Sequence, residues 1–397
     1  MAAASTTVAV VRCESYDQPE VDRAVRLAVA ACLGEDWAAG VKEPVLVKPN
    51  VLNPRRPEEG VCTHPAVLKA VLSTLRDAGV RDLSVGDSSG GSGVKPTATD
   101  RALEVSGLAA AARELGARVR SFDHEEAVSV PNPRGPQFRP LVLARPAVEA
   151  SREGWLWSVP KFKTHALTTL TGAVKNLFGT VPGAAKRETH RANPSIESFA
   201  NALVDIAVVL RPTLTVVDAV TAMEGEGPSG GSLVKLGLIV AGTDPVAVDA
   251  VLAALVGLEP RRVPTTRLGA ERGLGEADLS RIRVVGTSIS EARARRFRLP
   301  VVSAVARRAP AALTRAAISL MVTRPAFLAE RCTRCAVCAK NCPVGALSVT
   351  QADRVPRLDS DRCIACYCCH ELCPNQAVYI RWRHPVARVL FGTGRPH

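Results

Sequence analysis

The stretch PVLVKPNVLNPRRPEEGVCTHPAVLKAVLSTLRDAGVRDLSVGD, residues 44–87, decides the fold. It begins and ends with short apolar runs (44–50 and 82–87) that each lead into polar residues, as buried strands do. Between these runs the apolar spacing predicts a helix over 65–78, with Thr63 as its cap and Gly79 at its end. A strand, a helix and a second strand in this order form the repeating unit of a parallel sheet.

The same alternation extends along the chain on both sides of this unit. Helical patterns cover 20–33 and 100–115, and another begins after Thr168. We therefore predict that residues 1–290 form an α/β domain with a mostly parallel sheet flanked by helices. The further strand candidates are 7–11, 117–122, 155–160, 214–219, 235–242 and 281–286.

Nine of the twelve cysteines lie in one short segment near the carboxyl terminus. CTRCAVCAKNCP (332–343) and CIACYCCHELCP (363–374) both contain the spacing C-x2-C-x2-C-x3-C-P. In this arrangement three cysteines of one motif bind one cluster, and the fourth binds the other cluster. The sequence therefore predicts two 4Fe–4S clusters as cofactors. One would be held by Cys332, Cys335, Cys338 and Cys373, and the other by Cys363, Cys366, Cys369 and Cys342.

This segment resembles bacterial-type ferredoxins with two 4Fe–4S clusters, over about residues 328–382. The resemblance implies a small α+β domain, and the apolar runs after Pro343 and Pro374 fit short strands. Cys368 is an extra thiol, and using it as a ligand would break the spacing, so we exclude it. A pair of structural zinc sites is the alternative, but the repeated three-plus-one spacing favours clusters.

The net charge of +13 is concentrated in the last quarter of the chain. We predict a basic helical connector over 291–327 and a basic tail over 383–397. Basic flanks would offset the negative charge of the clusters and steer an acidic redox partner protein. Amphipathic patterns at 301–323 and in the tail leave peripheral membrane contact open, although packing of 301–323 between the domains is favoured. Nucleic acid is an unlikely partner, because aromatic residues make up 4% and no recognition motif appears.

Polar residues follow several of the predicted strands. In an open α/β sheet, ligands bind outside the carboxyl ends of the strands, so these residues would converge on one crevice. The loop 88–93 could also hold an anion through its backbone N–H groups. Each motif alone could instead be a turn or a helix cap. The predicted cofactor-binding residues are Lys48, Asn50, Asp87 and Ser88.

The segment 160–179 gathers cationic side chains on a predicted loop and the helix after it. Such a group suits a carboxylate or phosphate, and nearby acidic residues could handle protons. A solvated basic face and a surface turn are the alternatives. His190, in a later predicted loop, is a candidate for covering the crevice. The predicted catalytic residues are Lys161, Lys163, His165, Lys175, Asp218 and Glu224.

Taken together, the motifs resemble domain-of-unknown-function family 362, over roughly residues 40–255. The resemblance implies an iron–sulfur protein, because members are often fused to a ferredoxin-like carboxyl terminus, and it implies no particular reaction. It rests on KPNVL (48–52), THP (63–65), GDS (86–88), PKFKTH (160–165), LTGAVKNLFG (170–179), VDAVTAMEGEGP (217–228) and AGTDPVAVDAV (241–251).

These features favour an iron–sulfur oxidoreductase that passes single electrons to a small anionic substrate in the crevice. Two alternatives stay open: an electron-transfer subunit without its own catalysis, and a non-redox enzyme with structural clusters. The chain start has no basic segment ahead of an apolar one, and no apolar run reaches about 18 residues. We therefore expect a cytoplasmic protein.

Overall fold

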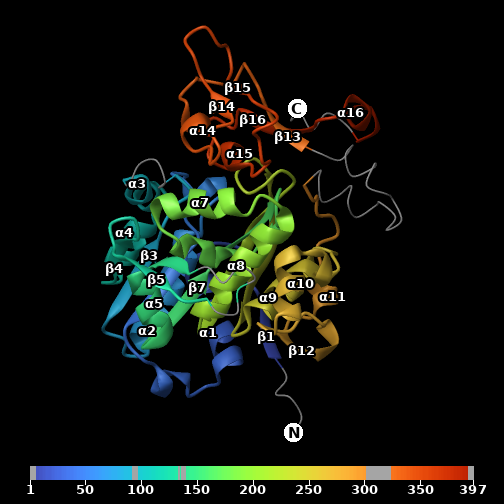
Figure 1. The fold of residues 1–397 in the computed structure, drawn as a ribbon. Helices are drawn as coiled ribbons and strands as arrows, with labels where there is room; N and C mark the ends of the chain where they lie inside the picture. Colours follow the sequence, from blue (N-terminus) through green and yellow to red (C-terminus); the bar gives the residue numbers. More distant parts are fainter. Residues whose placement is uncertain (1–5, 92–96, 133–134, 136–139, 301–322, 392–397) are drawn as a thin grey trace.

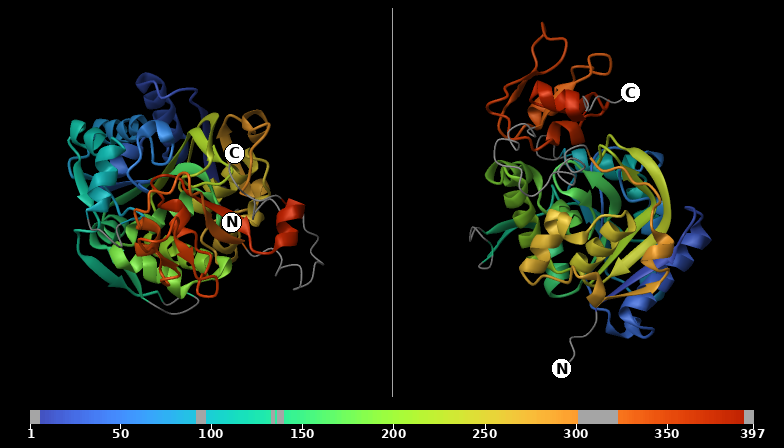
Figure 2. Two further views of the ribbon diagram at one scale, coloured as in Figure 1. Left: turned by 90° about the horizontal axis from the view of Figure 1, so that it is seen from above. Right: turned by 90° about the vertical axis from the view of Figure 1, so that its right-hand side faces the viewer.

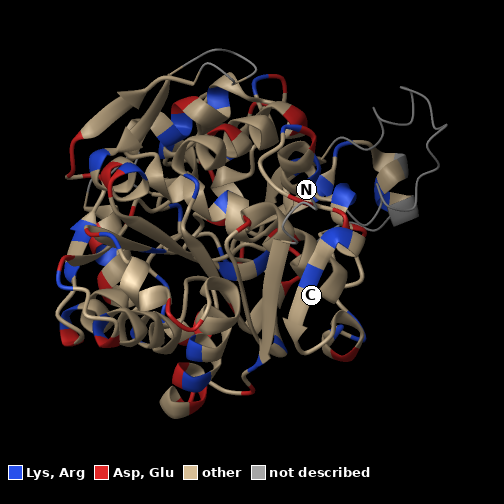
Figure 3. Cartoon of the chain, turned by 90° about the horizontal axis from the view of Figure 1, so that it is seen from below, with Lys and Arg blue, Asp and Glu red and all other residues tan. Residues whose placement is uncertain are grey.

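A computed structural model describes residues 6–91, 97–132, 135, 140–300 and 323–391. A large α/β part carries a small cysteine-rich part at one end (Figures 1 and 2). On the opposite end, seen in Figure 3, basic and acidic residues are interspersed. This even mixture agrees with the nearly balanced charge of the first 290 residues. None of the helices in the described ranges is long and apolar enough to cross a membrane.

One ten-stranded sheet runs through the α/β part. Its main order is β12-β1-β11-β10-β7-β2-β3-β4, and β8 and β9 branch from β10. The pairs from β10 to β4 are parallel, whereas β11 is antiparallel to both of its neighbours. This confirms the predicted mostly parallel sheet. The strands are β1 (Thr6–Arg12), β2 (Val45–Pro49), β3 (Leu83–Asp87), β4 (Arg118–Ser121), β7 (Trp155–Val159), β8 (Lys161–His165), β9 (Thr169–Thr171), β10 (Leu214–Glu224), β11 (Ser232–Gly242) and β12 (Ile282–Gly286).

Helices cover both faces of the sheet, and strand alternation assigns residues to each face. Val45 and Val47 pack with α1 and α2, whereas Leu46 between them packs in the core on the other face. A hairpin of β5 (Ala127–Val130) and β6 (Leu141–Ala144) lies outside the main sheet. The helices are α1 (Gln18–Leu33), α2 (Pro65–Asp77), α3 (Ala98–Val105), α4 (Leu108–Glu114), α5 (Arg145–Arg152), α6 (Ala173–Asn176), α7 (Gly183–Ala192), α8 (Ile196–Leu210), α9 (Pro245–Leu255), α10 (Pro264–Glu271) and α11 (Ile289–Ala292).

The cap predicted for α2 is wrong by one residue. His64 is the cap, and its Nδ1 accepts a hydrogen bond from the backbone of Ala66 at 3.2 Å. Thr63 is used elsewhere, because its Oγ1 accepts from Asn50 N at 2.8 Å and donates to Val159 O at 2.6 Å. The threonine thus ties the loop after β2 to the end of β7.

Two other local predictions are also wrong. The helix expected over 100–115 is two helices, because Gly107 adopts a φ of 73° between α3 and α4. The residues expected in a loop at 161–165 form β8, which pairs with β10 and β9. The loop 88–93 lies partly outside the described residues.

The small part contains two short antiparallel ladders, as the predicted α+β class requires. β13 (Thr323–Phe327) pairs with β16 (Val378–Trp382), and β14 (Leu347–Ser348) pairs with β15 (Arg357–Leu358). Its helices are α14 (Val337–Lys340), α15 (Cys368–Glu371) and α16 (Pro385–Phe391).

The helical connector predicted over 291–327 is helical only at its start. Helix α11 ends at Ala292, and β13 is a strand. Between them Arg298 is bound to the end of β10, because its carbonyl accepts from Gly225 N and its N–H donates to Glu224. Residues 301–322, which include most of the proposed amphipathic segment, lie outside the described residues.

The small part packs over the carboxyl ends of the parallel strands. The carbonyl of Glu371 accepts hydrogen bonds from Asn53 at 3.0 Å and Ser229 at 2.9 Å. Arg55 donates to the carbonyl of Cys373 at 3.0 Å, and Gln376 donates to the carbonyl of Ser229 at 3.1 Å. Loops of the α/β part therefore hold the backbone of the second cysteine motif directly.

Asp249 on α9 positions the short helix α6. Its carboxylate accepts from Ala173 N at 2.6 Å and from Val174 N at 3.1 Å, while a Cβ on Gly172 would collide with it. Burial raises the pKa of Asp249 to about 7, against the opposing effect of the two N–H donors. The carboxyl thus satisfies buried donors at the start of the helix that bears Lys175.

We expect Asp249→Ala to lower the free energy of unfolding by about 2–4 kcal/mol, because two buried N–H groups lose their acceptor. Because this pKa is raised, the folded state binds the proton more tightly than the unfolded state does. The stabilisation that Asp249 contributes is therefore complete below about pH 4 and falls as the pH rises to about 7. The difference from Asp249→Ala should therefore shrink over that range. Denaturant unfolding at several pH values measures it, with Asp278→Ala at an exposed cap as the control.

Candidate functional site

The two cysteine loops share one unusual backbone conformation. The residues on either side of the second cysteine of each motif have positive φ, namely Arg334 (56°), Ala336 (59°), Ala365 (53°) and Tyr367 (59°). A left-handed conformation costs a residue with a side chain roughly 1–2 kcal/mol. Because the same two positions adopt this conformation in both motifs, the loops curl in the same way.

The four cysteines predicted for the first cluster line one cavity. Cys335 is exposed, whereas Cys338 and Cys373 are buried. Burial raises the pKa of the Cys338 thiol to about 12, and the charges of Cys373, Cys335 and Cys332 add to the rise. The fourth cysteine of one motif therefore lies beside the first three of the other.

The cysteines predicted for the second cluster also lie close together. Burial raises the pKa of Cys369, and the charges of Cys366, Cys363 and Cys342 contribute. The fourth cysteine of each motif accepts a backbone N–H at 3.2 Å, from Ala346 and Ala377 respectively.

The chemistry of the donor set in these motifs fits iron–sulfur clusters. Thiolates are soft ligands, and a 4Fe–4S cluster takes one from each of its four irons, so its ligands do not converge on a point. Among the described residues, no group of three or more His, Cys, Asp or Glu side chains is arranged to hold a single metal ion.

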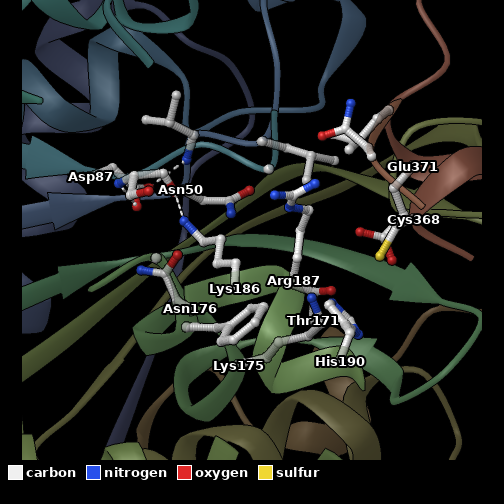
Figure 4. A pocket seen from close by; sticks show the side chains of 18 of the residues that line it. Asn50, Asp87, Thr171, Lys175, Asn176, Lys186, Arg187, His190, Cys368 and Glu371 are labelled. Atoms are coloured by element: carbon white, nitrogen blue, oxygen red, sulfur yellow. Dashed lines mark hydrogen bonds between the residues drawn. The ribbon is translucent and has the colours of Figure 1, made fainter. Parts of the chain in front are cut away.

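A small cavity of about 80 Å³ lies where the cysteine-rich part meets the α/β part (Figure 4). We call it the crevice. Its walls come from the loops after β2 and β3, from α6 and α7, and from α15. The polar residues that line it are Lys48, Asn50, Asp87, Ser88, Thr171, Lys175, Asn176, Lys186, Arg187, His190, Asn341, Cys368 and Glu371.

All four residues predicted to bind a cofactor line the crevice. Lys48 and Asp87 form a fully buried ion pair, with Nζ 3.0 Å from Oδ1. Asp87 also accepts from Val51 N at 2.8 Å and Ser88 N at 2.7 Å. Burial lowers the pKa of Lys48 and raises that of Asp87, and their mutual attraction opposes both shifts. The pair fixes the ends of β2 and β3 side by side.

Lys161 and Asp218 do not line the crevice. The Lys161 ammonium lies 2.9 Å from Asp218 and donates to the Tyr16 hydroxyl at 2.6 Å, while Tyr16 donates to Asp218 at 2.9 Å. Tyr16 also stacks on His64 at 3.6 Å between ring centroids. This closed cluster joins the chain before α1 to β8 and β10.

Lys163 and Glu224 do not line the crevice either, and both side chains already have partners. Lys163 donates to Asn50 at 2.7 Å and to the carbonyl of Val61 at 2.6 Å, and burial lowers its pKa to about 7. Glu224 pairs with Arg298 at 2.7 Å, six residues along β10 from Asp218. Glu224 and Asp218 therefore lie apart on β10, with different partners, and do not form one acidic group.

His165 reaches the crevice indirectly, through Glu371. Its Nδ1 accepts from Leu167 N at 3.0 Å, so its Nε2 carries the proton that faces Glu371 Oε1 at 2.8 Å. Burial lowers the pKa of His165 to about 4, with Lys175 adding to the effect. Burial alone would raise the pKa of Glu371, but His165, Lys175 and His190 outweigh it and lower this pKa to about 2.

Of the predicted catalytic residues, Lys175 is therefore the one that lines the crevice. Lys186, Arg187 and Glu371 were missed. The first two share α7 with His190, which does line the crevice as anticipated. Glu371 lies inside the second cysteine motif, and only the docking of the two parts brings it to the site.

Cys368 faces the crevice and not the cavity of the first cluster. It lies close enough to Cys366 for each thiol to shift the pKa of the other. The extra thiol thus lies between a predicted cluster ligand and the crevice.

Comparison with known proteins agrees with this architecture. Residues 45–254 match the family described as Domain of unknown function (DUF362). The chain belongs to the DUF362 family. Residues 324–374 match a 4Fe-4S dicluster domain, so this DUF362 protein carries a dicluster domain at its carboxyl end.

This DUF362 chain is 30% identical over 277 residues to a thylakoid-associated protein of Synechocystis sp., covering 68% of this chain and 79% of that one. The solved structures are more distant. The lactate racemase apoprotein from Thermoanaerobacterium thermosaccharolyticum has a TM-score of 0.40 at 11% identity, covering 60% of this chain and 54% of that chain. A Thermotoga maritima protein has a TM-score of 0.34 at 12% identity, covering 66% and 60%. Neither structural likeness bears on the reaction.

We expect Gly179→Ala to destabilise the protein by about 3–5 kcal/mol, because a Cβ there would collide with both Asp87 and Lys48 and separate a buried ion pair. Thermal unfolding of cluster-loaded protein measures the loss. Gly40→Ala is the matched control, since a Cβ on Gly40 meets nothing within 4 Å. Equal melting temperatures for the two variants would contradict the packing described.

Proposed function

We propose that this protein is an iron–sulfur oxidoreductase whose two 4Fe–4S clusters pass single electrons to a small anionic substrate in the crevice. The proposal rests on one observation: residues of the cysteine-rich part and of the α/β part line the same crevice. Cys368 and Glu371, from the motif that would bind the second cluster, face Lys175 and Arg187 of the α/β part. The electron donor and the cationic binding groups would therefore adjoin one small cavity.

The cysteine positions also support an order of transfer. The eight motif cysteines would hold the clusters, and each cluster supplies one electron at low potential. Cys335 is exposed, so a redox partner protein could approach the first cluster there. Exposed Arg331, Arg334 and Lys340 near it suit an acidic partner. Cys338 is close enough to Cys369 to influence its pKa, which supports transfer onward to the second cluster and the crevice.

Two reduced clusters together hold two electrons. A substrate that takes up both electrons without gaining negative charge must also take up two protons. Asp87, Asp218 and Glu224, the acid–base candidates from the sequence, are all ion-paired. His190 lines the crevice and is better placed to pass a proton to a substrate there. Burial lowers the pKa of His190 to about 4, which leaves the ring neutral.

A non-catalytic electron-transfer subunit is the second candidate, because exposed Cys335 would suit docking just as well. We keep the cytoplasm as the proposed location. The Synechocystis relative is named as thylakoid-associated, which supports adding peripheral membrane contact to the proposal.

We expect Cys366→Ala to lower the iron content from about eight atoms per chain towards about four, because one cluster loses a ligand. Cys368→Ala, two residues away, should retain about eight. Iron analysis and native mass spectrometry of protein purified without oxygen provide the comparison. Loss of iron in Cys368→Ala equal to that in Cys366→Ala would contradict the ligand assignment.

We expect small organic acids that carry a reducible group besides the carboxylate, such as 2-oxo acids, to reoxidise the reduced clusters of the wild-type protein, and Lys175→Ala to slow this reaction at least about 100-fold, because the acid loses a cationic partner. Stopped-flow absorbance of dithionite-reduced protein, freed of excess reductant, gives the rates. Ferricyanide, which needs no crevice, should oxidise both proteins equally fast.

Other outcomes of this test would reject the proposal. If no acid reacts but a partner protein reoxidises the clusters, the protein is an electron-transfer subunit. If a reaction on an acid survives loss of the clusters in folded protein, the enzyme is non-redox.

A further inference from the structure

Several buried polar groups at the crevice have no hydrogen-bond partner among the described residues. Three of them can donate to a ligand, namely Thr171 Oγ1, Arg187 Nε and, in one tautomer, His190 Nδ1, whereas Asn341 Oδ1 and Glu371 Oε1 can only accept. The side chains of Thr171 and His190 are 3% and 7% exposed. Leaving a buried polar group unpaired is costly, so several around one cavity indicate a site built for a polar ligand.

The charges at the crevice decide the sign of that ligand. Lys48 is paired with Asp87, and Lys186 donates to the carbonyls of Ser88 and Ser89. By contrast, no hydrogen bond or ion pair within the described ranges holds the Lys175 ammonium, although burial lowers its pKa. The Arg187 guanidinium donates to the carbonyl of Lys340 at 3.4 Å and keeps its Nε unpaired among the described residues. Lys175 and Arg187 are therefore the cations available to a ligand, which favours an anion.

The cavity also limits the size of the ligand. Sites for drug-sized molecules measure about 300–1,000 Å³, whereas the crevice measures about 80 Å³. A nucleotide or a flavin does not fit such a space. A carboxylate or phosphate group with few further atoms does, and both match the planar fork of arginine.

One anionic side chain of the protein already shares the crevice with Lys175. The Glu371 backbone is fixed by Asn53 and Ser229, and its carboxylate faces neutral His165 at 2.8 Å. Lys175 lines the same cavity and lowers the pKa of Glu371, so the two charges attract each other there. A bound anion would therefore compete with Glu371 for the same ammonium.

We propose that the crevice binds a small oxyanion, of carboxylate or phosphate type, through Lys175 and Arg187, with Thr171 and His190 as further hydrogen-bond partners. Glu371 weakens this binding by its charge. The proposal rests on the proposed function and deepens it, because it names the chemical class of the substrate.

Isothermal titration of the full-length, cluster-loaded protein under anaerobic conditions tests the site, with acetate and inorganic phosphate as separate, redox-inert probes. At least one probe should bind the wild type, and which one binds distinguishes the two types of oxyanion. Lys175→Ala should weaken binding at least about tenfold, whereas Glu371→Gln, which keeps the size of the side chain, should strengthen it about tenfold. Lys235→Ala should leave the affinity unchanged, since that exposed lysine pairs with Glu14 on the surface.

The proposal fails if neither probe binds the wild type, or if Lys175→Ala or Glu371→Gln binds as the wild type does. If Lys175→Ala loses its clusters, Lys175→Met, which keeps the aliphatic stem, replaces it in the same titration. Because the probes accept no electrons, this test is independent of cluster reoxidation. Binding without reoxidation by any acid would leave the oxyanion site intact and reject the oxidoreductase.

Discussion

The buried ion pair between Lys48 and Asp87 is the constraint on which the site depends. Removing two charges from water is costly, and the cost is offset here by hydrogen bonds from Val51 and Ser88 to the carboxylate and from the ammonium to the Pro49 carbonyl. Such a pair contributes more to position than to stability. It holds the ends of β2 and β3 at a fixed spacing, and Asn176 joins α6 to it by donating to the Lys48 carbonyl at 3.2 Å.

From this pair the remaining geometry follows in steps. Gly179 has no side chain and so lets the chain after α6 pass directly against both charges. Asp249 caps α6 from the opposite side, so the helix that carries Lys175 is fixed at its start by one carboxylate and near its end by Asn176. Within the described part of the chain, the Lys175 ammonium has no hydrogen-bond partner, because the surrounding residues hold the backbone of α6 and not this charge.

Much of this arrangement could be predicted from the sequence, and the remainder has an identifiable physical reason. Short-range patterns predicted most strands of the main sheet, although not β8 and β9, and the cysteine spacing grouped the two sets of four thiols that the structure places together. The roles of Lys161 and Lys163 could not be predicted from such short-range patterns. Strand alternation on β8 turns both to one buried side, where their partners, Tyr16 and Val61, come from distant parts of the chain. Glu371 was unpredictable for the same reason, since docking alone brings it to the crevice.

The placement of Glu371 has a consequence for how the two parts of the molecule work together. Under the proposed function, reducing a cluster and binding an oxyanion both add negative charge near α15. The two events therefore oppose each other, and by linkage each weakens the other by the same factor. A carboxylate fixed between them adds to the repulsion felt by any anion in the crevice. A substrate would thus bind best to the oxidised protein, and a product that gains negative charge would be expelled unless a proton accompanied each electron. Proton delivery through the neutral His190 would relieve this repulsion, so a residue proposed to bind the oxyanion would also allow turnover.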